Sequence, residues 1–209
     1  QLGERVARMI LEPYGIRFAQ AVAVAREHVR TVESPSFGFP VVLKIDAPHV
    51  AHKTEIGGVQ TGIADLATLR GAAVAMIERV GVDGVLVAET LSGIEMLAGI
   101  VVDDVFGPTI VLGMGGIFTE TLRDVARRFA PFDRTTAREM IDDLRAAPVL
   151  HGARTGVAYD LDALADLLVA LSWFAADNAE RLAEVDLNPV FLRPKPHGVV
   201  AADALIVTC

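Results

Sequence analysis

The stretch Gly38–Ala64, "GFPVVLKIDAPHVAHKTEIGGVQTGIA", joins two short apolar runs through a connection crowded with charged groups and imidazoles. The first run, Phe39–Ile45, is short and β-branched, which predicts a buried strand, and Gly58–Ala64 alternates like a second strand. A connection of this composition is typical of either a polar hairpin with solvated side chains or a phosphate-binding segment. Taken alone, the stretch favours neither interpretation.

Five residues of this stretch form a first candidate group: Lys44, His52, Lys53, Gly57 and Gly58. A lysine at the end of a buried strand places an ammonium where the apolar run stops, which suits a phosphate. A glycine pair lets the backbone approach an anion closely and present its N–H groups.

The composition of the whole chain limits the classes of protein that it can represent. Its 209 residues, 52% of them hydrophobic, are enough for one large domain or two small lobes. A net charge of −8 argues against nucleic-acid binding, which needs a basic face. The longest uncharged run, Val105–Thr119, has 15 residues, fewer than the roughly 20 that span a bilayer. Since no signal peptide opens the chain and Cys209 is the only cysteine, we expect a cytoplasmic protein without disulfides.

The hydrophobic periodicity predicts two α+β lobes, residues 1–89 and 90–209, hinged near residues 88–92. Asp65 is a candidate N-cap for one helix, and Thr136 and Glu139 have capping-box spacing in another. Helices are expected over residues 4–11, 20–30, 65–80, 134–146 and 160–176, and further strands over 84–90, 93–103, 109–113, 185–192 and 198–207.

Two further groups of polar residues accompany these elements. Glu89 and Glu95 flank a turn at the lobe boundary and could accept hydrogen bonds from the amine and hydroxyls of a nucleoside, although an ordinary acidic loop is the alternative. Asp186 and Asn188 project to one face of an extended strand, and Asp203 lies in the neighbouring one. Such oxygen ligands suit Mg²⁺, unless these are acids at a solvated strand edge. Together the groups have the composition of an ATP site without a Walker loop.

The ordered motifs "GFPVVLKI", "HK", "GGV", "GVLVAE", "LGMGGIFTE", "AREMI" and "DLNP" followed by "ADA" resemble the ATP-grasp domain of NDP-forming acyl-CoA synthetases. These are the ADP-forming acetate–CoA ligases, related to succinyl-CoA synthetase. The similarity runs from about Val6 to Val207. It implies an α+β, two-lobed ATP-grasp fold with the nucleotide site between the lobes, and a chain that is the β subunit or β segment of the enzyme.

The resemblance also implies a reaction, acid + CoA + ATP ⇌ acyl-CoA + ADP + phosphate, that proceeds through a phosphohistidine. The expected cofactors are ATP or ADP and Mg²⁺. The expected partner is a CoA-binding α subunit or fused α segment, where the acid and CoA bind. An alternative is a regulatory ATP-grasp module of a fused protein acetyltransferase. An ATP-grasp peptide or amine ligase has less support, because such enzymes usually carry their own acceptor site.

The family pattern assigns the nucleotide and the metal to particular residues. By this resemblance Lys44 would contact the nucleotide phosphates, Glu89 would lie by the adenine, and Glu95 would hold the ribose. Asn188 and Asp203 match the Mg²⁺ ligands.

The same pattern implies roles in phosphoryl transfer. Asp186 matches an acid that stabilises a docking phosphohistidine, and His52 resembles a second phosphorylation site, since a neutral imidazole can hold a phosphoryl group briefly. Lys53 and the Gly57 and Gly58 amides would then screen the charge of the transferring group.

Overall fold

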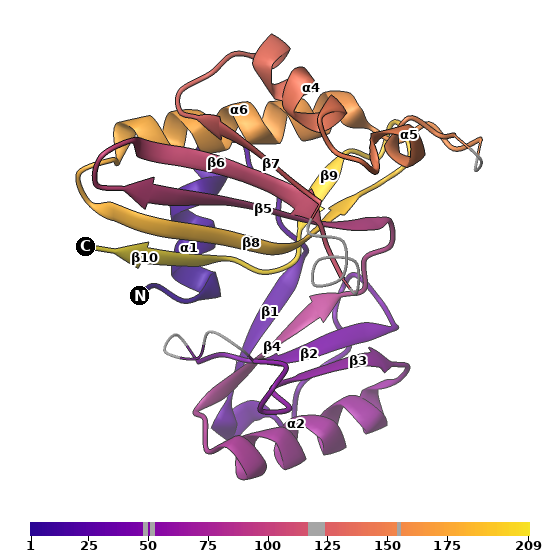
Figure 1. Ribbon diagram of the computed structural model, residues 1–209. Helices are drawn as coiled ribbons and strands as arrows, with labels where there is room; N and C mark the ends of the chain where they lie inside the picture. The colour runs from indigo at the N-terminus through magenta and orange to yellow at the C-terminus, as the bar shows by residue number, and fades with distance from the viewer. Residues whose placement is uncertain (48–49, 51–52, 117–123, 154–155) are drawn as a thin grey trace. The chain divides into compact units, whose positions relative to one another are not determined.

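The computed structural model describes residues 1–47, 50, 53–116, 124–153 and 156–209 (Figure 1). The chain forms two compact units, one of residues Ala19–Leu91 and one that combines Gln1–Phe18 with Ser92–Cys209. The expected first lobe therefore differs at its start, because residues 1–18 belong to the larger unit. Their helix buries Ala7 and Leu11 in the core of that unit, and the N–H of Leu2 donates to the Ile206 carbonyl at 2.7 Å.

The smaller unit is an antiparallel sheet in the order β1-β4-β2-β3, with one helix packed on it (Figure 1). Leu69, Met76 and Ile77 of the helix are buried in one cluster with Leu43 and Ile45 of the sheet. The elements are β1 Ala21–Ala25, η2 Arg26–His28, β2 Val41–Ile45, β3 Val59–Ile63, α2 Leu66–Val80 and β4 Gly84–Glu89.

Two sequence expectations for this unit have different outcomes. The N-cap of α2 is confirmed, because the Asp65 carboxylate accepts the Thr68 N–H at 2.8 Å. The helix expected over residues 20–30 is wrong: residues 21–25, "AVAVA", form an edge strand paired with β4, and a short 3₁₀ turn follows. Alternating alanine and valine fit an edge strand, in which only Val24 is buried.

The larger unit is a sheet in the order β10-β8-β5-β6-β7, with β9 also paired to β8. Figure 1 shows α4 and α6 lying along this sheet. The elements are α1 Glu4–Leu11, η1 Glu12–Tyr14, β5 Ile94–Asp103, β6 Gly107–Met114, β7 Val125–Phe129, α4 Arg134–Asp142, α5 Ala147–Leu150, α6 Leu161–Asp177, β8 Leu182–Leu192, β9 Val199–Ala201 and β10 Leu205–Thr208.

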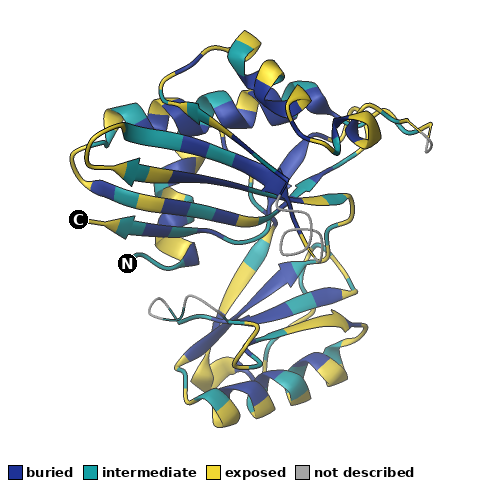
Figure 2. Ribbon diagram, viewed as in Figure 1, coloured by how far each residue is buried: buried dark blue, intermediate teal, exposed yellow. Residues whose placement is uncertain are grey.

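Among the described residues of the larger unit, one face of the sheet packs against the helices and the other face is more exposed. Along β5, Met96, Ala98 and Ile100 are fully buried in the cluster that includes α1, α4 and α6, whereas Val101 is half exposed. Figure 2 shows the resulting alternation of buried and less buried residues along the strands. Among the described helices, none is long and apolar enough to cross a membrane.

The structure corrects three details of the larger unit. The N-cap of α4 is Asp133, which accepts the Thr136 N–H at 2.9 Å, so Thr136 lies inside the helix and not at its cap. The strand expected over residues 198–207 is divided into β9 and β10. Strand β7 and helix α5 were not expected, since "VARRF" and "APVL" are too short for a clear period.

Candidate functional site

The three predicted metal and phosphohistidine residues come together on β8 and the segment between β9 and β10. The Ala202 N–H donates to the Pro189 carbonyl at 2.9 Å, which extends the β8–β9 pairing by one step. Asp203 is the next residue, and it therefore lies beside Asn188 across the strand pair. On the other side of this break, Asp186 is paired with Leu205 of β10.

Asn188 lies in a β-bulge of β8. In the β5–β8 pairing Met96 faces Val190 and Ala98 faces Leu187, so that Asn188 and Pro189 together oppose one residue of β5. Proline has no N–H for the ladder and is tolerated in a sheet at such a bulge. Asn188 is exposed, and Asp186, on the same face by the two-residue period, is half buried.

The donor set fits a hard divalent cation. Asn188 and Asp203 offer amide and carboxylate oxygens, and the Ala204 N–H donates to Asp203 Oδ1 at 2.8 Å. Mg²⁺ is commonly held by one or two carboxylates, with waters and substrate phosphates completing its coordination. Among the described residues no group of three histidine, cysteine or acidic side chains could hold a metal ion. The amide and carboxylate oxygens of Asn188 and Asp203 suit a cation whose remaining ligands are phosphate oxygens and waters.

Glu95 lies at the start of β5, directly against the two glycines that follow β6, Gly115 and Gly116. The Gly115 N–H donates to the Glu95 carbonyl at 2.8 Å. A Cβ on Gly115 would lie 2.8 Å from the Glu95 carbonyl carbon, and a Cβ on Gly116 would lie 3.0 Å from Oε2 of its carboxylate. Because Gly115 and Gly116 have no side chains, the Glu95 backbone and carboxylate can lie directly against them. Sequence reasoning used these glycines only as a family motif and missed this contact.

Glu89 ends β4 in the smaller unit, and its carboxylate is fixed by the backbone. The Gln20 N–H donates to Glu89 Oε1 at 2.8 Å, while the Glu89 N–H donates to the Gln20 carbonyl at 2.9 Å. These two bonds hold the residue in one orientation at the end of the strand.

Lys44 lies in β2 on the sheet face opposite to α2. Its neighbours Leu43 and Ile45 face the α2 core, so the two-residue period directs Lys44 to the other face, in register with Leu86. The lysine is buried. An ammonium is costly to bury unless charged or polar groups accompany it.

The glycine pair does not act as the sequence suggested. The N–H groups of Gly57 and Gly58 donate to carbonyls within the turn, at 3.0 and 2.6 Å, the second being that of Lys53. A Cβ on Gly58 would lie 2.8 Å from both Ile45 Cδ1 and the Lys53 oxygen. Glycine is needed here for close packing, and the two N–H groups do not face an anion. His52 lies outside the described residues.

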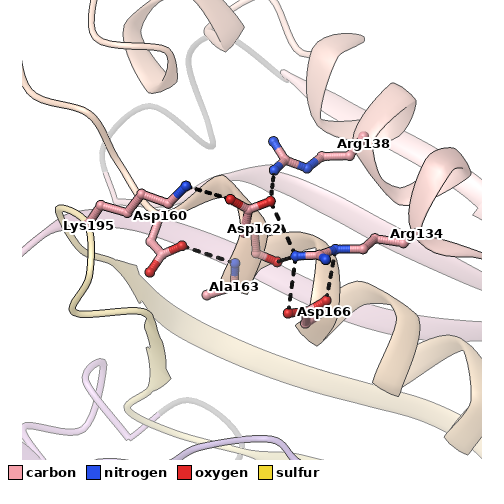
Figure 3. Close-up of polar contacts among 7 residues, drawn as sticks. All are labelled: Arg134, Arg138, Asp160, Asp162, Ala163, Asp166 and Lys195. Atoms are coloured by element: carbon pink, nitrogen blue, oxygen red, sulfur yellow. Dashed lines mark hydrogen bonds and ion pairs between the residues drawn. The ribbon is translucent and has the colours of Figure 1, made fainter.

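A charged cluster that sequence reasoning missed ties the β8–β9 connection to two helices (Figure 3). Lys195 Nζ and Arg134 contact the Asp162 carboxylate at 2.6 and 3.2 Å, and Arg138 also binds it. Arg134 Nε reaches Asp166 at 3.0 Å. Hydrogen bonds from Lys195 and Arg138 lower the pKa of Asp162 to about 2. The pairing joins α4, α6 and the connection that follows the strand carrying Asn188.

Comparison with known proteins shows the family of this chain. A family model described as an ATP-grasp domain matches residues 1–208. The chain is 34% identical to the β subunit of ADP-forming acetate–CoA ligase I of Pyrococcus furiosus, covering 99% of this chain and 91% of that subunit. It is 38% identical to ADP-forming acetate–CoA ligase I of Archaeoglobus fulgidus, but spans only 29% of that longer protein.

Solved structures show the same fold. An acetyl-coenzyme A synthetase 1 of Candidatus Korarchaeum cryptofilum, in complex with coenzyme A and Ca-AMPCP, has a TM-score of 0.90 and 35% identity and covers 100% of this chain and 93% of that chain. A second structure of that protein, with coenzyme A and Mg-AMPPCP, has a TM-score of 0.82 and 36% identity, covering 99% and 92%. In it a phosphohistidine segment points towards the nucleotide binding site. The expected family and fold are thus confirmed: this chain belongs to the ATP-grasp domain family, together with the β subunits and β-type segments of ADP-forming acetate–CoA ligases.

Proposed function

We propose that this chain binds ATP or ADP with Mg²⁺ and is the phosphoryl-transferring part of an ADP-forming acyl-CoA synthetase. The observation that carries the proposal is the convergence of Asp186, Asn188 and Asp203 at the bulge of β8. The complexes of the Korarchaeum relative with nucleotide analogues and coenzyme A support it.

Asn188 and Asp203 hold the metal ion in this proposal. When bound, Mg²⁺ would neutralise the negative charge that spreads over the transferred phosphoryl group. Asp186 is half buried on the same face of β8. Its carboxylate accepts an N–H from an incoming histidine ring, fixes the tautomer and stabilises the ring while it is positively charged.

The nucleotide is bound by residues that the structure holds in place beforehand. Lys44 compensates the charge of the phosphates. Glu95, seated against Gly115 and Gly116, accepts hydrogen bonds from the ribose hydroxyls, and Glu89 accepts one from the adenine amine. Because the amides of the glycine pair bond within their own turn, we assign no phosphate contact to them.

The complete reaction requires a second protein part. In the direction of ATP synthesis, a histidine nitrogen takes the phosphoryl group of an acyl phosphate, the P–O bond to the acyl group breaks and the carboxylate leaves. A terminal oxygen of ADP then takes the phosphoryl group from the histidine, which releases the neutral imidazole. That histidine and the CoA site belong to an α-type portion, a subunit or a fused segment, since this chain spans only 29% of the longer Archaeoglobus relative. Lys53 and His52 would assist as a cation and a second phosphate carrier.

Isothermal titration calorimetry with ADP, with and without Mg²⁺, tests the first step. We expect metal-dependent binding that Asp203→Ala and Lys44→Met abolish. Lys44→Met keeps the apolar length of the buried side chain, so that the loss reports the charge. Glu180→Ala removes an exposed acid of the same unit and should bind normally. A wild-type chain that binds no Mg·ADP would refute the proposal, and a chain that binds it but never exchanges phosphate with the partner histidine would be a regulatory module.

A further inference from the structure

Four large apolar side chains protrude at one end of the larger sheet: Val101, Val105, Phe106 and Phe129, which are 51, 82, 70 and 63% exposed. The rings of Phe106 and Phe129 lie with their centroids 6.2 Å apart. Monomeric soluble proteins rarely expose large apolar side chains in such a contiguous group, and when they do the group commonly marks an interaction site. We call this group the Phe106 patch.

Two members of the Phe106 patch, Val101 and Phe129, lie on the sheet face away from the helix core, and the other two lie in the turn between β5 and β6. Val101 of β5 pairs with Thr109 of β6, and Thr109 pairs with Phe129 of β7, so these side chains share one face. Val102 and Ala126, which alternate with them, pack on the helix side in the core. The connection between β5 and β6 is exposed (Figure 2).

A defined turn presents Val105 and Phe106. The Asp103 carboxylate accepts the Val105 and Phe106 N–H groups at 2.8 and 2.9 Å, and these two bonds lower the pKa of Asp103. Gly107 closes the turn with a φ of +75°, in the left-handed region that favours glycine. A turn ordered in advance reduces the entropy lost when a partner binds to it.

The charges around the Phe106 patch discriminate between possible partners. Asp103 and Asp104 lie in the turn, and Glu184 is paired with Val101 from the adjacent strand, all three exposed. Arg127, one step along β7, is the neighbouring cation on this face. Two copies of a chain with a net charge of −8 would bring mostly acids towards acids. A surface with an apolar centre and lysine or arginine at its rim complements the patch.

We propose that the Phe106 patch is the docking surface for the CoA-binding portion of the enzyme, and that this portion presents an apolar surface rimmed by basic residues. The proposal rests on the proposed function, which requires such a portion. The patch is distinct from the proposed metal residues of the same sheet, because Val101 pairs with Glu184, which is four residues along β8 from Asn188. Loss of docking and loss of nucleotide binding can therefore be measured separately.

Hydroxyl-radical footprinting of the complete enzyme tests the proposal. Trp173, which is 53% exposed on α6, is the internal control. The labelling rate of each residue is divided by its rate in the unfolded chain. In the complete enzyme, the normalised rates of Phe106 and Phe129 should be at least about fivefold lower than their exposed fractions in the free chain predict. The normalised rate of Trp173 should match its exposed fraction. Labelling of both phenylalanines as strong as that of Trp173 would overturn the proposal.

Variants test the energetics. Phe106→Ser with Phe129→Ser should weaken association with the CoA-binding portion by roughly 30-fold or more, as truncated aromatic anchors do at interfaces. Mg·ADP binding should stay unchanged, and Trp173→Ser should affect neither. Normal association of the double variant refutes the docking surface, whereas a wild-type chain that binds no Mg·ADP refutes the proposed function. Phe106 protection that depends on self-association of this chain would identify a second copy as the occupant and also overturn the proposal.

Discussion

Replacement of Gly115 by alanine should disturb nucleotide binding through Glu95. The new Cβ would lie 2.8 Å from the Glu95 carbonyl carbon and 2.9 Å from the Met96 nitrogen, about 0.6 Å inside the 3.4 Å at which ordinary contacts begin. Both atoms are backbone, so no side-chain rotation relieves the overlap. The ends of β5 and β6 must separate, and Glu95 moves with β5.

The size of the effect follows from these contacts. Overpacking of this kind costs about 1–3 kcal/mol, which for a chain of this size lowers Tm by roughly 2–12 °C. If the displaced carboxylate loses one hydrogen bond to the ribose, a further 1.5–3 kcal/mol of binding energy is lost, or about tenfold to 150-fold in Kd. Calorimetry with Mg·ADP and a thermal melt measure the two quantities.

Gly71→Ala is the matched control. Gly71 lies within α2, no atom lies within 4 Å of its built Cβ, and its φ is ordinary. Alanine there should stabilise the chain by about 1 kcal/mol and leave the Kd for Mg·ADP unchanged. If Gly115→Ala bound Mg·ADP with wild-type affinity, the argument that these glycines seat the Glu95 carboxylate would be wrong.

Three further predictions concern other parts of the chain. Asp162→Asn should lower Tm at pH 7, because the pKa of the Asp162 carboxyl falls from 3.8 to about 2 on folding. The difference in Tm between variant and wild type should vanish as the pH falls from about 4 to 2. Thermal melts across this pH range measure it. Labelled ATP should place acid-labile phosphate on the partner histidine and on His52. His52→Ala should remove the second of these, and unchanged labelling would exclude His52 as a carrier. Asp65→Ala should destabilise the smaller unit by about 1 kcal/mol through loss of the α2 N-cap, with Asp83→Ala, an exposed acid that caps no helix, as the control in denaturant unfolding.

The sequence predicted those features that depend on local patterns. The long helix α6 begins after Asp160 as expected, because its apolar period is strong and the Asp160 carboxylate accepts the Ala163 N–H. The "AVAVA" strand was mistaken for a helix because alanine favours helices, and only pairing with β4 decides its structure. Gly57 and Gly58 were expected to present their N–H groups to a phosphate, and the sequence did not reveal that these groups bond to carbonyls of their own turn.

The metal residues show why some of the site could be predicted and some could not. The two-residue period was enough to place Asp186 and Asn188 on one face. It could not reveal that the second strand breaks between Ala201 and Leu205, opposite the bulge at Asn188. Val190 pairs with Ala201 and Asp186 pairs with Leu205, so β9 and β10 keep one register along β8, and Asp203 lies opposite Asn188 as it would in a continuous strand. Departures from regular pairing commonly occur at functional sites, and here the bulge in the β5–β8 pairing and the break between β9 and β10 both lie at the proposed Mg²⁺ ligands.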